Sequence, residues 1–267
     1  MAFVLEDAPA SRPHLVPHFN GSNNIPLAQD AEAIRKVVQE FCSLSSVRER
    51  VRANVDSAPL LFSKDRVWRA MIGCLLSSCQ RAGSQSPLQR FGKLDPYPLT
   101  LKRVLSSAEP EALIRNELEN FGGFRFPARA GRLAGRNLKW LETGGWEQVR
   151  RHYSVLAQQR LRSPEREDFR AEREASRFAD RNLAGFGPKQ SRNLWQLLGL
   201  TRYEIPIDRR VRKWINRNLS MHVEAEQLWK AAPYESVLDF LQIGCFKAGK
   251  TLPCVFDAVL FSIGERE

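Results

Sequence analysis

Apolar residues recur along most of the chain at intervals of three and four residues, the spacing that keeps one face of a helix apolar. Asp30 is placed to cap the first such segment, whose apolar face carries Ile34, Val37, Val38 and Phe41. Helical spacing continues over residues 65–80, 87–91, 99–105, 110–119, 129–141, 167–182, 235–243 and 253–263. No stretch alternates between apolar and polar residues for long enough to build a sheet. The pattern predicts an all-α protein of roughly ten short helices joined by tight loops.

Two regions lack this spacing. Residues 1–28 are rich in Pro, Asn and His and are predicted to form an extended or disordered arm. Gly144 and Gly145 break the pattern, and the Arg- and Gln-rich residues that follow, up to Pro164, are predicted to be a connection. The rest of the chain is long enough for one large domain or two lobes that share a core.

A glycine turn between two predicted helices is the most informative local pattern. Gly185 and Gly187 flank Phe186, and Pro188 stands where the second helix would begin. Glycine adopts positive φ readily, and proline at the first helical position loses only an amide that has no partner there. The free amides of the new helix, with its dipole, form a ready site for a phosphate. A structural corner between two helices is the alternative interpretation of the turn taken alone.

The net charge is concentrated around this turn. The chain carries a formal charge of +11, and residues 121–220 hold 22 Lys and Arg against 10 Asp and Glu. The other residues hold 19 against 20, so the whole surplus lies in this stretch. A basic region of this kind is typical of a protein that binds nucleic acid. A solvated arginine-rich surface is the alternative.

Lys189 and Asp208 are the candidate catalytic residues of this region. Lys189 lies in the first turn of the helix after the glycines, where the positive end of the dipole disfavours the ammonium form and so favours a nucleophilic amine. Asp208 follows Ile205-Pro206-Ile207 and opens another amphipathic helix. A carboxylate there can stabilise a positively charged sugar. The simpler roles are a phosphate contact for Lys189 and an N-cap for Asp208.

Other classes of protein find little support. No apolar run approaches a membrane span, and we expect a cytoplasmic protein, nucleoid-associated if bacterial. The five cysteines are scattered and form no zinc pattern, which favours a reducing compartment. No carboxylates or histidines cluster near the turn, which disfavours a nuclease that uses metal-bound water. No cofactor is predicted, and a monovalent cation at the hairpin is left open.

The run from Leu183 to Trp214 resembles the helix-hairpin-helix and Gly/Pro-Asp signature of the endonuclease III superfamily of DNA glycosylases. Its bifunctional members carry a lysine four residues after the first hairpin glycine and an aspartate about nineteen residues later. Lys189 is four residues after Gly185, and Asp208 is nineteen after Lys189. Monofunctional branches lack the lysine. The resemblance therefore implies a glycosylase that is also an abasic-site lyase.

Within the superfamily, the chain is most similar to type 2 8-oxoguanine DNA glycosylases. The segments that carry this likeness are 123–130, 187–191 and 207–209, and it extends from residue 65 to the end, weakly between 144 and 164. It implies a fold of two lobes, one of residues 29–80 with 205–267 and the other of residues 81–204. No cysteine cluster follows Asp208, so the iron–sulfur site of endonuclease III is not expected.

The resemblance also implies roles for individual residues. Lys189 and Asp208 would be catalytic. The strand would be held by the hairpin and a gap-filling side chain, with the DNA contacts at Gly185, Phe186, Gly187, Gln190, Arg192 and Gln80. The extruded base would meet Asn193, Phe256 and Asp257, although burial in the core is the simpler role for Phe256. The implied partner is double-stranded DNA with a modified base, bound by a monomer.

Three functions remain open from the sequence. The first is excision of 8-oxoguanine followed by strand cleavage through β-elimination. The second is excision of a bulky modified pyrimidine from foreign phage DNA, which would make the protein a defence enzyme. The third is a non-catalytic helix-hairpin-helix module in which Lys189 only touches phosphate. The joint spacing of Lys189 and Asp208 favours an enzyme over the binding module.

Overall fold

A computed structural model describes residues 25–78, 85–165 and 168–264, and these ranges contain helices and no strand. The predicted all-α fold class is therefore confirmed. The thirteen α-helices of the described residues are α1 (Ala28–Phe41), α2 (Ser45–Val51), α3 (Lys64–Ser77), α4 (Pro87–Gly92), α5 (Leu101–Leu105), α6 (Pro110–Phe121), α7 (Pro127–Trp140), α8 (Trp146–Arg160), α9 (Phe169–Asn182), α10 (Pro188–Leu197), α11 (Arg209–Asn218), α12 (Ala231–Lys247) and α13 (Pro253–Ile263). None of these helices is long and apolar enough to cross a membrane.

Two of these helices were not predicted. Helix α8 occupies residues that the sequence analysis assigned to a connection, and α2 covers a charged segment that was assigned no element. The buried side of α8 consists of Trp146, Val149, Tyr153 and Leu156, spaced by three or four residues. Most of its other residues are polar, but Val155 is apolar and exposed, and the charged Arg160 is buried, so both blur the contrast between the two faces. The blurred contrast explains why the helical spacing did not stand out in the sequence.

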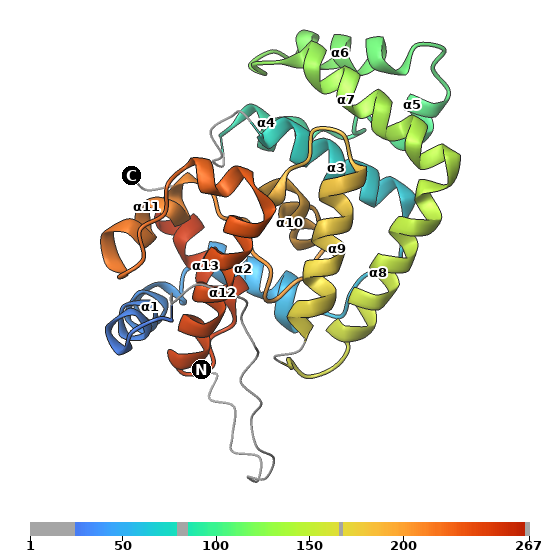
Figure 1. Cartoon of the computed structure of the whole chain (residues 1–267). Coiled ribbons are helices and arrows are strands. Elements are labelled where there is room, and N and C mark those ends of the chain that lie inside the picture. Colours follow the sequence, from blue (N-terminus) through green and yellow to red (C-terminus); the bar gives the residue numbers. More distant parts are fainter. Residues whose placement is uncertain (1–24, 79–84, 166–167, 265–267) are drawn as a thin grey trace.

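The buried apolar residues form two clusters. The first unites α1, α2, α11, α12 and α13, and the second unites α3 to α10. In Figure 1, α1 and α11 to α13 lie together on one side, and α5, α6 and α7 lie at the opposite end. Helix α3 belongs to the second cluster, although the sequence analysis placed residues 64–77 with the first lobe. Most of the arm predicted for residues 1–28 lies outside the described residues.

Helices α9 and α10 meet at the glycine turn, which α7 holds in place. Gly185 has a φ of +82°, and a Cβ there would come within 2.6 Å of Leu133 Cδ1 in α7. One turn further along α7, the buried Asn137 accepts a hydrogen bond from the Ala184 amide at 2.6 Å and donates one to the Ala184 carbonyl at 3.1 Å. The turn is thus fixed both by its backbone conformation and by a side chain from another helix.

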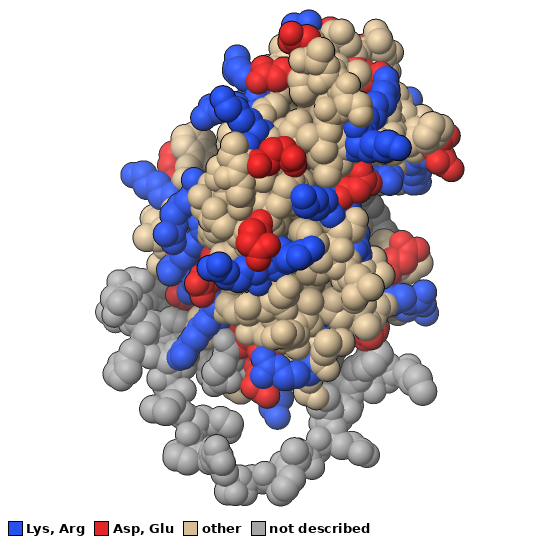
Figure 2. Space-filling view, turned by 90° about the vertical axis from the view of Figure 1, so that its right-hand side faces the viewer, with Lys and Arg blue, Asp and Glu red and all other residues tan. Residues whose placement is uncertain are grey.

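Part of the positive surplus is internal. The guanidinium groups of Arg160, Arg192 and Arg202 are buried, and those of Arg160 and Arg202 donate to backbone carbonyls. On the face shown in Figure 2, Lys and Arg side chains are interspersed with Asp and Glu. The net charge therefore overstates the basic surface that is available to a polyanion, because several arginines serve the interior.

Candidate active site

Lys189 lies in the first turn of α10 with its side chain partly exposed. Among the described residues, no hydrogen bond or ion pair engages its amine. Burial raises the pKa of the nearby Cys74 thiol to about 12, and the charge of Lys189 opposes that rise. Cys74 is therefore a neutral thiol beside the amine. The structure leaves the lysine nitrogen available to a ligand.

Asp208 is the N-cap of α11. Its Oδ1 accepts hydrogen bonds from the amides of Arg210 at 2.8 Å and Val211 at 3.1 Å. Burial raises the pKa of Asp208, but the Arg210 guanidinium, the Val211 amide and the charge of Lys189 together bring it below its ordinary value. The carboxylate is therefore ionised at neutral pH and lies within the electrostatic influence of Lys189. Capping and proximity to the lysine coexist in one residue.

Arg210 was not predicted to belong to the site. Its Nε donates to Asp208 Oδ2 at 2.8 Å, and its guanidinium lies 4.1 Å from the centre of the Phe261 ring. Both oxygens of Asp208 are thus engaged, one by amides and the other by a cation. The carboxylate is suited to stabilise nearby positive charge, while acting as a free base would require it to leave Arg210.

A second polar group lies on the same face of α10 as Lys189. Gln196, seven residues after the lysine, donates to Asp257 Oδ2 at 2.9 Å and accepts from Arg50 Nη2 at 3.0 Å. Arg50 also pairs with Asp257 at 2.9 Å and lies 4.5 Å from the centre of the Phe261 ring. The charge of Asp208 is among those that act on Asp257, whose pKa burial raises. Helices α2, α10, α11 and α13 therefore converge around Asp257 and Phe261, on the face of α10 that carries Lys189 two turns earlier.

The three residues predicted to contact the base differ in how far the protein buries or occupies their side chains. Asn193 is partly exposed, one turn after Lys189, with its Nδ2 3.6 Å from Cys74 Sγ and 3.4 Å from Gln190 Oε1. Asp257 lies where α2, α10, α11 and α13 meet, but its carboxylate is already bound by Arg50 and Gln196. The prediction for Phe256 is wrong, because its fully buried ring packs edge-on against Trp214 in the first cluster.

The residues predicted to contact the DNA strand also differ in exposure. Gly187 caps α10 with ordinary φ, and a Cβ there would meet nothing within 4 Å, so its backbone faces open space. The Gly185 backbone is exposed as well. The side chains of Phe186 and Gln190 are buried, and that of Gln190 is 3.4 Å from Ser77 Oγ. The side chains of Phe186 and Gln190 are therefore not available to a strand in this structure.

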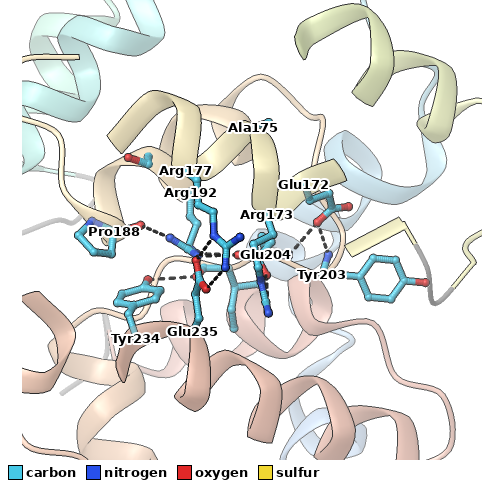
Figure 3. A network of polar contacts seen from close by, with 12 residues as sticks. Glu172, Arg173, Ala175, Arg177, Pro188, Arg192, Tyr203, Glu204, Tyr234 and Glu235 are labelled. Atoms are coloured by element: carbon cyan, nitrogen blue, oxygen red, sulfur yellow. Dashed lines mark hydrogen bonds and ion pairs between the residues drawn. The ribbon is translucent and has the colours of Figure 1, made fainter. Parts of the chain in front are cut away.

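Of the two remaining predicted strand contacts, one is buried and the other cannot be compared with the structure. Arg192 is 1% exposed, and its Nε donates to the buried Glu204 at 2.8 Å (Figure 3). Its prediction as a DNA contact is wrong, because the guanidinium is held inside the protein by a carboxylate. Gln80, the predicted gap-filling residue, lies outside the described residues.

A pocket lies beside the turn, where the end of α3 meets the start of α7. Its walls are Leu75, Leu76, Ser78, Phe124, Arg125, Phe126, Arg129, Ala130 and Leu133. Leu75 and Leu133 also lie next to Gly185. The ring of Phe124 packs edge-on against Phe91, whereas that of Phe126 is 54% exposed. Residues 124–126 therefore form a packed corner in which the Phe126 ring stays at the surface.

Sequence reasoning missed Arg50, Gln196 and Arg210 as members of the site. Arg210 had a local signal, since it lies two residues after Asp208. Arg50 had none, because it is far from the turn in the sequence. Within the described residues, no group of three or more His, Cys, Asp or Glu side chains could hold a metal ion.

The chain matches no family model and no curated protein sequence. Its structure is similar to that of the 8-oxoguanine DNA glycosylase of Methanocaldococcus jannaschii, with a TM-score of 0.58. The alignment covers 88% of this chain and 95% of that one at 13% sequence identity. The predicted glycosylase fold is confirmed by this similarity, which at such identity concerns the fold alone.

Proposed function

We propose that this protein is a DNA glycosylase with abasic-site lyase activity, which removes a modified base from duplex DNA and cleaves the strand. The observation that carries the proposal is the amine of Lys189, without a partner among the described residues, at the start of α10 near the ionised Asp208. The similarity of the fold to that of a DNA glycosylase also supports the proposal.

The first step would be to hold and open the duplex. Backbone amides at the start of α10, beside the unobstructed Gly187, would bind a phosphate of the strand. The target nucleotide would be extruded, because its C1′ is inaccessible within the base stack. This step costs a few kcal/mol, which the backbone contacts would offset.

The second step would be displacement of the base. Lys189 Nζ, as the neutral amine, would attack C1′, and the glycosidic bond would break with its electron pair leaving on the base, which takes up the proton that Nζ loses. The ionised Asp208 would stabilise the positive charge that develops on the sugar. Cleavage of the C1′–O4′ bond, with O4′ taking up a proton, would then open the sugar ring and give an imine between Nζ and C1′.

The third step would be cleavage of the strand. Loss of a proton from C2′ would expel the 3′ phosphate from C3′, and hydrolysis of the imine would regenerate the amine of Lys189. The partly exposed Asn193, Arg50 and Phe261 would border the extruded base, with Gln196 and Asp257 behind them holding Arg50 in place. We take 8-oxoguanine as the first substrate to test, because the structural relative bears that activity in its name. A bulky modified pyrimidine is the second.

The test is an incision assay on duplexes that each carry one modified base, with borohydride to trap an imine. Wild-type protein is expected to nick at least one duplex and to form a covalent adduct. Lys189→Gln is expected to lose nicking and trapping by at least about 1,000-fold, because the amine is the nucleophile. It should still bind, with a salt slope reduced by about one.

A matched control is Lys213→Gln, which removes an exposed lysine of α11 that has no ion pair among the described residues. It is expected to keep nicking and trapping. If wild-type protein binds the duplexes but traps no imine on any of them, the lyase activity is excluded, and if it also releases no base, the non-catalytic binding module replaces the enzyme.

A further inference from the structure

Lys189 and Asp208 lie at the starts of two different helices, which a non-helical connection of residues 199–208 joins. Their separation therefore depends on what ties α10 to this connection. One buried side chain contacts both. Arg192 Nη1 donates to the carbonyl of Pro188 at 2.9 Å, and its Nε donates to Glu204 Oε2 at 2.8 Å. Pro188 is the residue before Lys189, and Glu204 is four residues before Asp208.

A second path runs from Arg192 to Asp208 through Tyr234 of α12. The guanidinium lies 4.5 Å from the centre of the Tyr234 ring. The Tyr234 hydroxyl accepts a hydrogen bond from the Ile207 amide at 2.5 Å and donates one to the Ile205 carbonyl at 3.2 Å. Ile207 is the residue before Asp208. Arg192 thus reaches the chain neighbour of each proposed catalytic residue.

The connection is held rigidly at its Glu204 end (Figure 3). The buried Glu172 of α9 accepts hydrogen bonds from the backbone amides of Arg202, Tyr203 and Glu204 at 2.7 to 2.8 Å. Arg173 donates to the other carboxylate oxygen of Glu204 at 3.0 Å. Glu204 is therefore an anchored acceptor, and a shift of Arg192 would move α10 relative to it.

We propose that Arg192 is a positioning residue that sets the separation of Lys189 and Asp208, a role that rests on the proposed function. A buried ion pair contributes little to stability compared with apolar residues of similar volume. Its value here is geometric, because the planar fork of arginine can hold a carbonyl and a carboxylate at once. An error of about 1 Å in the placement of reacting groups costs on the order of 100-fold in rate.

The test compares two Arg→Lys variants within the same network. Arg192→Lys keeps the positive charge beside Glu204 but cannot bridge to Pro188 as well. Arg177→Lys is the matched control, because Arg177 pairs with Glu235 through Nε at 2.7 Å and contacts neither Pro188 nor Glu204. Melting temperature, duplex affinity and single-turnover rates of nicking and imine trapping are measured for both, well below their melting temperatures.

Arg192→Lys is expected to lower the single-turnover rate about 100-fold while duplex affinity changes less than about threefold. Arg177→Lys should keep the wild-type rate. If both variants share one rate while wild-type protein is active, the positioning role is overturned and the proposed function stands. If wild-type protein forms no imine on any duplex, both proposals fall together.

A double variant separates positioning from folding. Arg192→Met with Glu204→Gln removes the buried charge pair but leaves an acceptor for Arg173, which also keeps its contact with Asp239 at 2.7 Å. The melting temperature should recover relative to Arg192→Met alone, while the rate stays low. A rate that recovers together with the melting temperature would contradict the inference.

Discussion

Asp208 shows how one residue meets a structural and an electrostatic demand together. It caps α11 through two amides, and it keeps its charge because Arg210 and Lys189 favour the ionised form over the neutral form that burial favours. A helix cap is a common role for aspartate, so the sequence alone could not separate the two interpretations. In the structure the cap and the ion pair are compatible, since the capping oxygen and the oxygen paired with Arg210 are different atoms.

This arrangement predicts a change in pH dependence for Arg210→Gln. Arg210 lowers the pKa of Asp208, so its removal leaves burial to raise that pKa. A carboxylate with a raised pKa loses its charge at a higher pH when the solution is acidified. The acid limb of the excision rate should therefore move to higher pH in the variant, as measured by single-turnover rates between pH 3 and pH 7, about the range in which carboxylates titrate in proteins. A limb that stays in place would show that Asp208 does not govern it.

At the scale of elements, the glycine turn was the feature that the sequence predicted best. The helix end, the turn and the new helix at Pro188 all occur where the residue pattern indicates them. The two glycines nevertheless differ. Gly185 needs its positive φ and has Leu133 close by, whereas Gly187 has ordinary φ and free space around it. The sequence pattern does not distinguish the two glycines, because both simply flank Phe186.

The difference predicts opposite outcomes for two alanine variants. Gly185→Ala should lower the free energy of unfolding by about 1 to 3 kcal/mol, because alanine at positive φ is strained and its Cβ meets Leu133. Gly187→Ala should change stability by less than about 0.5 kcal/mol. Its methyl group would nevertheless stand where a phosphate approaches, so duplex binding should weaken. Urea unfolding and binding titrations of both variants check this, and unimpaired binding by Gly187→Ala would remove Gly187 from the phosphate site.

At the scale of the whole molecule, buried arginines link the two apolar clusters. Arg160, at the end of α8 in the second cluster, donates to the carbonyls of Val55 at 3.0 Å, Ser57 at 2.8 Å and Gly199 at 3.0 Å. Val55 packs against the first cluster. Burial, followed by the charge of Arg202, lowers the pKa of Arg160 to about 10, so it remains a cation at neutral pH. It therefore ties the α8 end of the second cluster to the first cluster.

We expect Arg160→Met to lower the free energy of unfolding by roughly 3 kcal/mol or more, because several buried carbonyls lose a charged donor. Arg162→Met is the control, since that side chain is 58% exposed and its only ion pair among the described residues is 3.9 Å long. Its effect should stay within about 0.5 kcal/mol. Denaturant unfolding of the two variants makes the comparison, and equal midpoints would deny Arg160 its linking role.

The sequence by itself determined the helical class, the turn and the spacing of Lys189 and Asp208, because helix periodicity, glycine conformation and capping act between near neighbours in the chain. It could not place Arg192, which looked like one more basic residue on a DNA-binding helix. Its burial depends on Glu204 and Tyr234, which reach it only after the chain folds back. The same holds for Arg50, which meets Asp257 from the far end of the sequence. Tertiary structure decided which charges face solvent, because desolvation and pairing depend on residues that are distant in the chain and adjacent in space.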